Sequence, residues 1–290
     1  MAEIKSKTRA ALFMIAAAAS FSLTALAVKS LPGDIPVEQK LLARSVVALL
    51  VSGFYIWGDG SKGWMPVNLE LIFLRSLFGI VAMFCYFIAV AGLPLSEAVT
   101  LNHLSPFFVA VFASIFLGEK MTRLQLGAVF FAFFGAVLVL RPGLVPLSTA
   151  SVLGLISAML AGAAYTLLRE LRKYDSPQKI VFWFSGFMFL VTAPLTLWRG
   201  RLPDVRETLL LAAVGVAGVM GQLCLTAAYR YAPGGEVAIY TYLGVAFSML
   251  WQVVFFEHSL ELLPVTGAAV ITVGAYINWR AGKSVTKSEQ

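Results

Sequence analysis

Residues 94–108 read PLSEAVTLNHLSPFF, a polar opening to an apolar run that extends to residue 117. Runs of this length match the roughly 20 residues that a helix needs to cross a bilayer. Ten of them occur, near residues 10–28, 37–57, 68–90, 95–117, 122–140, 150–168, 179–198, 207–227, 234–256 and 260–279. They are apolar on all sides, whereas the strands of a membrane barrel alternate apolar and polar residues. The sequence therefore predicts an all-α integral membrane protein with ten transmembrane helices.

The composition agrees with this prediction. Hydrophobic residues make up 59% of the chain, charged residues make up 13%, and the mean hydropathy is +0.84. The 22 lysines and arginines are scattered over short connections rather than gathered on one stripe, which argues against a nucleic-acid partner. Fourteen of them fall on the side of both termini and six on the other side, so we expect both termini in the cytoplasm. We predict a multi-pass protein of the cell (inner) membrane, in which the signal-peptide-like first run remains as an uncleaved helix.

The sequence lacks the residue groups that a catalytic site or a cofactor site requires. Cys85 and Cys224 both lie inside apolar runs, so we interpret them as packing residues rather than a disulfide or metal site. The fifteen acidic residues fall in loops, tails or helix ends, and no paired carboxylates lie at depth. No glycine-rich phosphate loop is present. We therefore expect no enzymatic activity, no cofactor and no metal.

The chain matches itself when it is shifted by 139 residues without a gap. The shift pairs Gly79 with Gly218, Cys85 with Cys224, Pro94 with Pro233, Glu97 with Glu236, and Arg141 with Arg280. In the first two helices of each half the shift is 141, where DIP at 34–36 meets DSP at 175–177. We predict two five-helix repeats, residues 1–145 and 146–290. Because five is odd, the second copy is inverted, and inverted repeats are the architecture of many secondary transporters.

The sequence resembles the EamA-type branch of the drug/metabolite transporter superfamily. The resemblance lies in PLSEAVTLNHLSPFFVAVFASIFLGEKMTRLQLGAVFFAFFGAVLVLRPG at 94–143 and, more weakly, in its second copy at 232–277. It implies ten helices, cytoplasmic termini and a central cavity lined largely by helices 1, 3, 4, 6, 8 and 9. Family members move amino acids, nucleotide-derived metabolites, amines and drugs. The second copy departs from the first where Pro106 becomes Val245, so we expect this half to bend differently.

The opening stretch supplies the first candidate site. Glu97 and Glu236 stand at helix starts, where the helix dipole favours a carboxylate, and we interpret both as anchors in preference to substrate ligands. Asn102 and His103 lie about 8–9 Å further along the helix, at a depth where polar side chains usually face a protein interior or a wet cavity. Pro106 frees the carbonyl of Asn102, so we predict a hinge there. An interhelical hydrogen bond plus a kink is the structural alternative.

Two arginines lie inside predicted helices. For Arg44 we favour an interface position reached by its long side chain, whereas Arg75 is a candidate for binding an anionic or carboxylate group. Gln222 stands in mid-helix among glycines, where its amide is a candidate for hydrogen bonding to a polar substrate. The aromatic candidates for substrate binding, most of which also suit interface anchors, are Tyr86, Tyr165, Tyr240, Tyr242 and Trp251.

These residues predict a secondary transporter that moves a small polar metabolite by alternating access. An amino acid or amino-acid-like compound, including an aromatic one, suits the candidate residues, through export, exchange or facilitated diffusion. The alternatives are a multidrug or amine exporter and a lipid flippase of the same fold. Membrane lipid is an expected partner, and the chain is a monomer or a homodimer, with the alanine stripe Ala128, Ala132 and Ala136 as packing or as a dimer seam. If protons are coupled, His103 is the candidate carrier within a helix.

Overall fold

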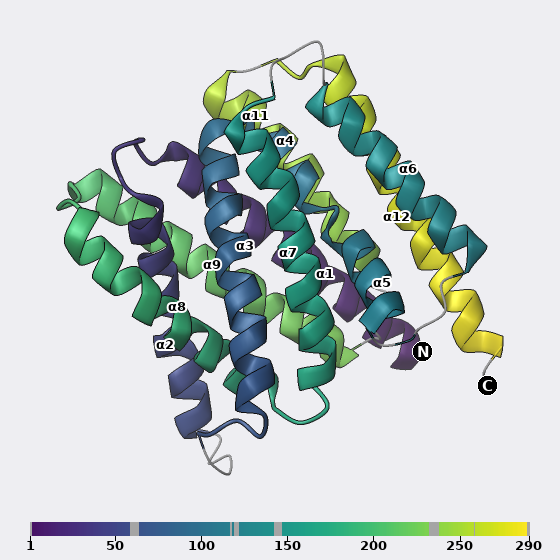
Figure 1. The fold of residues 1–290 in the computed structure, drawn as a ribbon, viewed down its shortest axis with the longest axis horizontal. Coiled ribbons are helices and arrows are strands. Elements are labelled where there is room, and N and C mark those ends of the chain that lie inside the picture. Colours follow the sequence, from purple (N-terminus) through teal and green to yellow (C-terminus); the bar gives the residue numbers. More distant parts are fainter. Residues whose placement is uncertain are drawn as a thin grey trace.

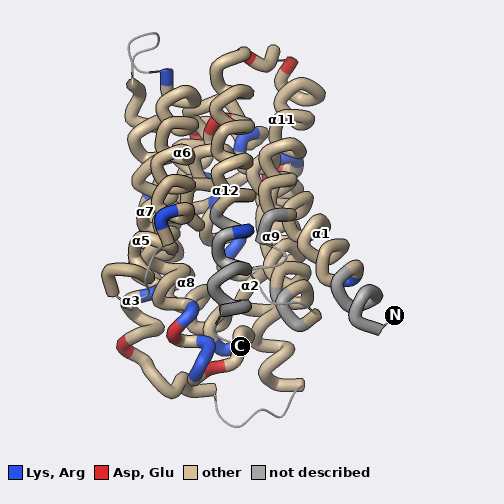
Figure 2. The backbone as a smooth tube through the Cα atoms, turned by 90° about the vertical axis from the view of Figure 1, so that its right-hand side faces the viewer, with Lys and Arg blue, Asp and Glu red and all other residues tan. Residues whose placement is uncertain are grey.

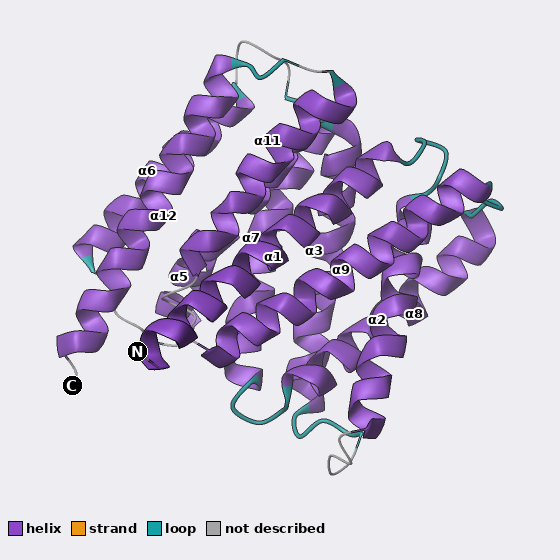
Figure 3. Cartoon of the chain, turned by 180° about the vertical axis from the view of Figure 1, so that it is seen from behind, coloured by secondary structure: helices purple, strands orange, loops and turns teal. Residues whose placement is uncertain are grey.

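The computed structural model describes residues 2–58, 64–116, 118, 122–141, 147–231, 238–257 and 259–288. Over these residues the chain is helical and contains no strand (Figure 3). The helices are α1 (Ala2–Ser30), α2 (Val37–Gly58), α3 (Leu69–Gly92), α4 (Leu95–Asn102), α5 (Ser105–Phe116), α6 (Arg123–Leu140), α7 (Thr149–Leu171), α8 (Pro177–Arg199), α9 (Val205–Tyr231), the 3-10 helix η1 (Ala238–Tyr242), α11 (Leu243–Phe256) and α12 (Leu262–Ser288).

The number of membrane-crossing helices agrees with the prediction. Eight spans in the described part of the chain are long and apolar enough to cross a membrane, and two shorter apolar helices, Tyr240–Phe256 and Leu262–Ile277, complete the ten. The fourth span consists of α4 followed by α5, and the ninth begins with η1 and continues as α11. Most of the tube in Figure 2 is free of charged residues, as a bundle surrounded by lipid requires. The all-helical membrane fold is confirmed.

The packing of the helices follows the sequence repeat. Helix α1 packs along α9 and helix α3 packs along α7, and the 139-residue repeat exchanges these two pairs. The contacts of α5 with α7 and of α11 with α1 are exchanged in the same way. Helices α2 and α8 form a pair of repeat counterparts, and so do α6 and α12 at one edge of the bundle (Figure 1). A two-fold relation between the halves accounts for these exchanges; the division into residues 1–145 and 146–290 stays a prediction.

Small residues let α6 and α12 approach closely. A Cβ atom placed on Gly135 would lie 2.8 Å from the carbonyl oxygen of Gly267, so neither position has room for a side chain. Gly274 meets the backbone of Ala128 and Ala132 on the same face. The alanine stripe of α6 is therefore buried against α12 of the same chain rather than offered to a second copy.

The matched Asp-x-Pro triplets hold equivalent connections. The Asp175 carboxylate, between α7 and α8, accepts the Val67 N–H before α3, at 3.1 and 3.0 Å from its two oxygens. Asp34, between α1 and α2, pairs at 2.8 Å with Arg201, between α8 and α9. The hydrogen bond from Arg201 is the main reason that the pKa of Asp34 lies below its ordinary value. Each triplet thus joins the connection after the first helix of its half to a connection of the other half.

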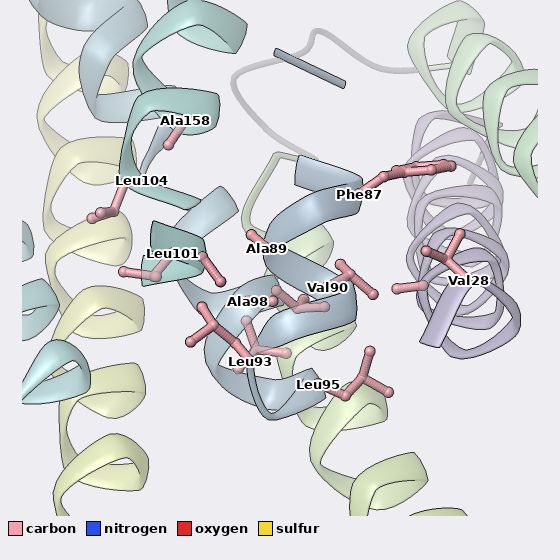
Figure 4. Close-up of a cluster of buried hydrophobic side chains, with 14 of the residues drawn as sticks. Val28, Phe87, Ala89, Val90, Leu93, Leu95, Ala98, Leu101, Leu104 and Ala158 are labelled. Carbon is pink, nitrogen blue, oxygen red and sulfur yellow. The ribbon is translucent and has the colours of Figure 1, made fainter. Parts of the chain in front are cut away.

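The apolar core lies where α3, α4 and α7 meet. Phe87, Val90, Leu95, Leu101 and Leu104 are almost completely buried (Figure 4). The core therefore fixes the broken fourth span between the two repeats.

Both ends of the chain lie toward the end of the bundle that carries the α2–α3 and α7–α8 connections (Figures 1 and 3).

Candidate functional site

The fourth span breaks in the middle of the protein. Helix α4 ends at Asn102, His103 and Leu104 form a turn, and α5 begins at Ser105. Pro106 causes the break, because it has no N–H to donate to the carbonyl of Asn102 four residues earlier. The Pro106 side chain itself is exposed, and the Asn102 side chain is partly buried without a hydrogen bond to any described residue. The break leaves backbone acceptors that another element has to satisfy.

The corresponding break in the second half satisfies one of them, the carbonyl of His103. The Tyr242 hydroxyl donates to the carbonyl of His103 at 3.1 Å, and the ring centroids of His103 and Tyr242 lie 5.1 Å apart. Nε2 of His103 lies 3.0 Å from the carbonyl oxygen of Thr241, and Nδ1 lies 2.8 Å from that of Val99. A neutral imidazole carries one N–H, so only a doubly protonated ring donates to both oxygens. Since the 139-residue shift places His103 on Tyr242, the two breaks join through equivalent residues.

Helix α11 makes two further contacts across the halves. The indole N–H of Trp251 donates to the hydroxyl of Ser22 on α1 at 3.0 Å. The side-chain oxygen of Gln252 accepts the backbone N–H of Ser96 at 2.9 Å and its hydroxyl at 2.7 Å. Gln252 thereby caps the start of α4, a role that its sequence position did not indicate.

The start of α4 also carries an ion pair. Glu97 and Arg141, each with a side chain only 9% exposed, pair at 2.7 Å, and Arg141 also pairs with the 61% exposed Glu261. Glu97 therefore faces an arginine of the protein instead of lipid headgroups. Its repeat counterpart Glu236 lies outside the described residues.

A second polar group lies between α2, α3, α7 and α9, and we call Arg44, Arg75, Tyr86 and Tyr165 the arginine–tyrosine cluster. The Arg75 guanidinium lies 4.0 Å from the ring centroid of Phe184 on α8, and its Nε and Nη1 atoms are buried without a hydrogen bond. Arg75 interacts electrostatically with Arg44 and Tyr165. Arg44 in turn interacts with Tyr86 and with Tyr165, whose side chain is 45% exposed.

Arg44 is the member of this cluster that sequence reasoning placed elsewhere. A Cβ on Gly218, the middle residue of α9, would lie 3.4 Å from the Arg44 guanidinium carbon. The guanidinium therefore points toward the middle of the bundle rather than toward an interface. The pairing of Gly218 with a glycine in the repeat was the available signal, since such a glycine leaves room for a bulky neighbour.

Two further candidates have different surroundings. Gln222 lies one turn after Gly218 on α9, so both residues share the face that meets Arg44. Tyr240 lies in η1, the short helix that begins the ninth span, and is 37% exposed. No group of three or more His, Cys, Asp or Glu residues in the described part of the chain is placed to hold a metal ion.

Known proteins with similar sequences are transporters. The model of the EamA-like transporter family matches residues 8–141 and 148–280. The pseudopaline exporter CntI of Pseudomonas aeruginosa is 29% identical, over 90% of this chain and 93% of the exporter. A riboflavin transporter of Brucella anthropi is 26% identical over 79% of this chain and 83% of its own length. Solute carrier family 35 member G1 of Mus musculus is 28% identical over 93% of this chain and 79% of its own length.

A solved crystal structure has the same fold. It aligns with a TM-score of 0.64 at 19% identity and covers 94% of this chain and 97% of that chain. The likeness extends over nearly the whole bundle, and at this identity it concerns the fold alone.

Proposed function

The chain belongs to the EamA-like transporter family, and from this premise we propose that it transports an amino acid or amino-acid-like metabolite whose carboxylate binds Arg75. It is a multi-pass membrane transporter of small molecules and not an enzyme. The observation that carries the proposal is the Arg75 guanidinium, which lies inside the bundle and makes no hydrogen bond to any described residue. A buried cation without a hydrogen-bond partner is costly, and a substrate carboxylate offsets that cost.

The transport cycle that we propose is alternating access. The halves 1–145 and 146–290 rock about the junction of the two helix breaks, with Pro106 as the hinge. Asn102 and His103 line the substrate path from the first half, together with Tyr86. Tyr165, Gln222, Tyr240, Tyr242 and Trp251 line it from the second half. His103 is the group available for proton coupling if transport requires protons.

We further propose that both termini face the cytoplasm of a cell (inner) membrane and that the substrate moves outward. The excess of basic residues in the connections on the side of the termini supports the orientation. The name of the Pseudomonas exporter supports the direction. Export, exchange and facilitated diffusion all suit the same site, and a monomer or homodimer is compatible with it.

The test is counterflow of labelled amino acids and amines into proteoliposomes that contain the purified protein. We expect carboxylated compounds to be taken up and Arg75→Gln to lower that uptake by about 10- to 100-fold, the worth of a charged hydrogen-bond pair. The exposed helix-start variant Arg123→Gln is the matched control and retains uptake. Uptake of cationic amines alone, unchanged in Arg75→Gln, would instead establish the multidrug or amine exporter. Lipid scrambling without solute uptake would establish the flippase.

A further inference from the structure

Arg44 and Arg75 approach the centre of the protein from opposite ends of the bundle. Arg44 lies seven residues after the start of α2, about 10 Å along the helix, and Arg75 lies six residues after the start of α3, about 9 Å along it. Helices α2 and α3 are consecutive and antiparallel, so these starts are at opposite membrane faces. The two guanidinium groups nevertheless lie within electrostatic range of each other. Both side chains therefore extend toward the middle of the membrane.

The two guanidinium groups lie against two glycines that the sequence repeat pairs with each other. A Cβ on Gly79 would lie 3.6 Å from Nη1 of Arg75, and a Cβ on Gly218 would lie 3.4 Å from Nη1 of Arg44. The 139-residue shift pairs these glycines. The arginines themselves have no counterparts, since Val214 matches Arg75 and Ser185 matches Arg44. Two positions related by the two-fold symmetry thus each carry one positive charge.

The described residues supply no negative charge to balance them. Neither arginine forms an ion pair or a hydrogen bond there, and their electrostatic partners are each other, Tyr86 and Tyr165. The ion pairs that the acids of this part of the chain do form are with Arg141, Lys173, Arg199 and Arg201 instead. Two like charges at membrane depth repel each other and lack the solvation that water gives. One carboxylate neutralises only one of them.

We propose that Arg44 and Arg75 bind two separate carboxylates of one substrate, so that the transported compound is a dicarboxylate of the amino-acid-like class. The inference rests on the proposed function and narrows its substrate. Each guanidinium is held on a different helix, Arg75 over Phe184 of α8 and Arg44 against Gly218 of α9, so each presents its own pair of donors. Tyr86 and Tyr165 interact electrostatically with Arg44, and their rings would accept the ammonium of such a compound by cation–π contact. Because the two charges lie at symmetry-related positions, a dicarboxylate meets equivalent sites when either half opens.

The experiment compares ligands that differ in one charge. Thermal stabilisation of the purified protein is titrated with the dicarboxylates from succinate to suberate and with their monoamides, and with glutamate against glutamine. We expect the preferred diacid to act at a concentration about 10- to 100-fold lower than its monoamide, since one charged hydrogen-bond pair is lost. Arg44→Gln and Arg75→Gln each bring this ratio close to one. Arg44→Lys and Arg75→Lys retain part of the preference, and Arg123→Gln retains all of it.

The outcomes separate this inference from the proposed function. Monoamides that match diacids in the wild type, or a full diacid preference in Arg44→Gln, would overturn the two-carboxylate site. Stabilisation by monoamides that only Arg75→Gln removes would still support the proposed function. Bisphosphates that outcompete every diacid, or phosphatidylglycerol vesicles whose stabilisation disappears in both variants, would show that the arginines bind phosphate and overturn the inference. Failure of all anionic ligands would overturn both proposals.

Discussion

The buried ion pair at the start of α4 makes an asymmetric prediction about stability. Glu97 and Arg141 lie 2.7 Å apart with side chains 9% exposed, and Arg141 has a second partner in Glu261. Arg141→Gln leaves the Glu97 carboxylate buried without a cation, which costs about 3–5 kcal/mol. Glu97→Gln costs less, about 1–3 kcal/mol, because Arg141 keeps Glu261. Glu261→Gln removes a largely exposed partner and costs about 1 kcal/mol or less.

Thermal unfolding in detergent, followed by the fluorescence of the six tryptophans, measures this order. We expect Arg141→Gln to lower the melting temperature by on the order of 10 °C. The double variant Glu97→Gln/Arg141→Gln loses less than the sum of the single losses, because no charge is left unpaired in the pair. Equal losses in Glu97→Gln and Arg141→Gln, or an additive double variant, would refute the reasoning.

Three further predictions test the helix break, the repeated triplet and the α6–α12 contact. Tyr242→Phe leaves the His103 carbonyl without its 3.1 Å donor, and we expect it to lower the free energy of unfolding by about 1–3 kcal/mol in chemical denaturation. Tyr240→Phe, at a 37% exposed residue, is the control and changes this free energy little. Equal effects of the two variants would contradict the hydrogen bond between the two helix breaks. Asp175→Ala leaves the Val67 N–H unpaired and lowers the melting temperature more than Asp175→Asn, which keeps an acceptor; a neutral alanine variant would be inconsistent with this tether. Gly135→Ala places a Cβ 2.8 Å from the backbone of α12 and destabilises by about 1–3 kcal/mol, whereas Gly127→Ala, with nothing within 4 Å, gains up to about 1 kcal/mol in helix propensity. A Gly135→Ala protein as stable as wild type in the same unfolding assay would show that the two helices are not in such close contact.

The sequence predicted a hinge at Pro106 in one continuous fourth helix, whereas the structure divides that span into α4 and α5. A proline two residues before the end of the stretch 94–108 removes a backbone donor in any helix, so the break follows from local chemistry. The backbone carbonyl of His103 accepts a hydrogen bond from the hydroxyl of Tyr242, which is 139 residues away. The local sequence contains no information about that contact. The repeat made the pairing discoverable, since it places these two residues on each other.

Arg44 is a second residue whose surroundings the local sequence does not indicate. An arginine seven residues into an apolar helix has the length to reach an interface, and nothing in its own helix opposes that position. Gly218 of α9 gives its guanidinium a place in the middle of the bundle instead. The direction of a long side chain is set by the space that its neighbours leave.

The sequence by itself determined the membrane class and the ten helices, because bilayer thickness and missing water act on every residue of a span in the same way. The two matched halves follow from the sequence as a prediction. The tertiary structure alone decided that two arginines with no ion pair to the described residues lie within electrostatic range of each other, and that two broken helices bridge one another. These depend on which faces of α2, α3, α9 and α11 meet. Close packing of distant segments selects those faces, and no periodicity within one helix contains that selection.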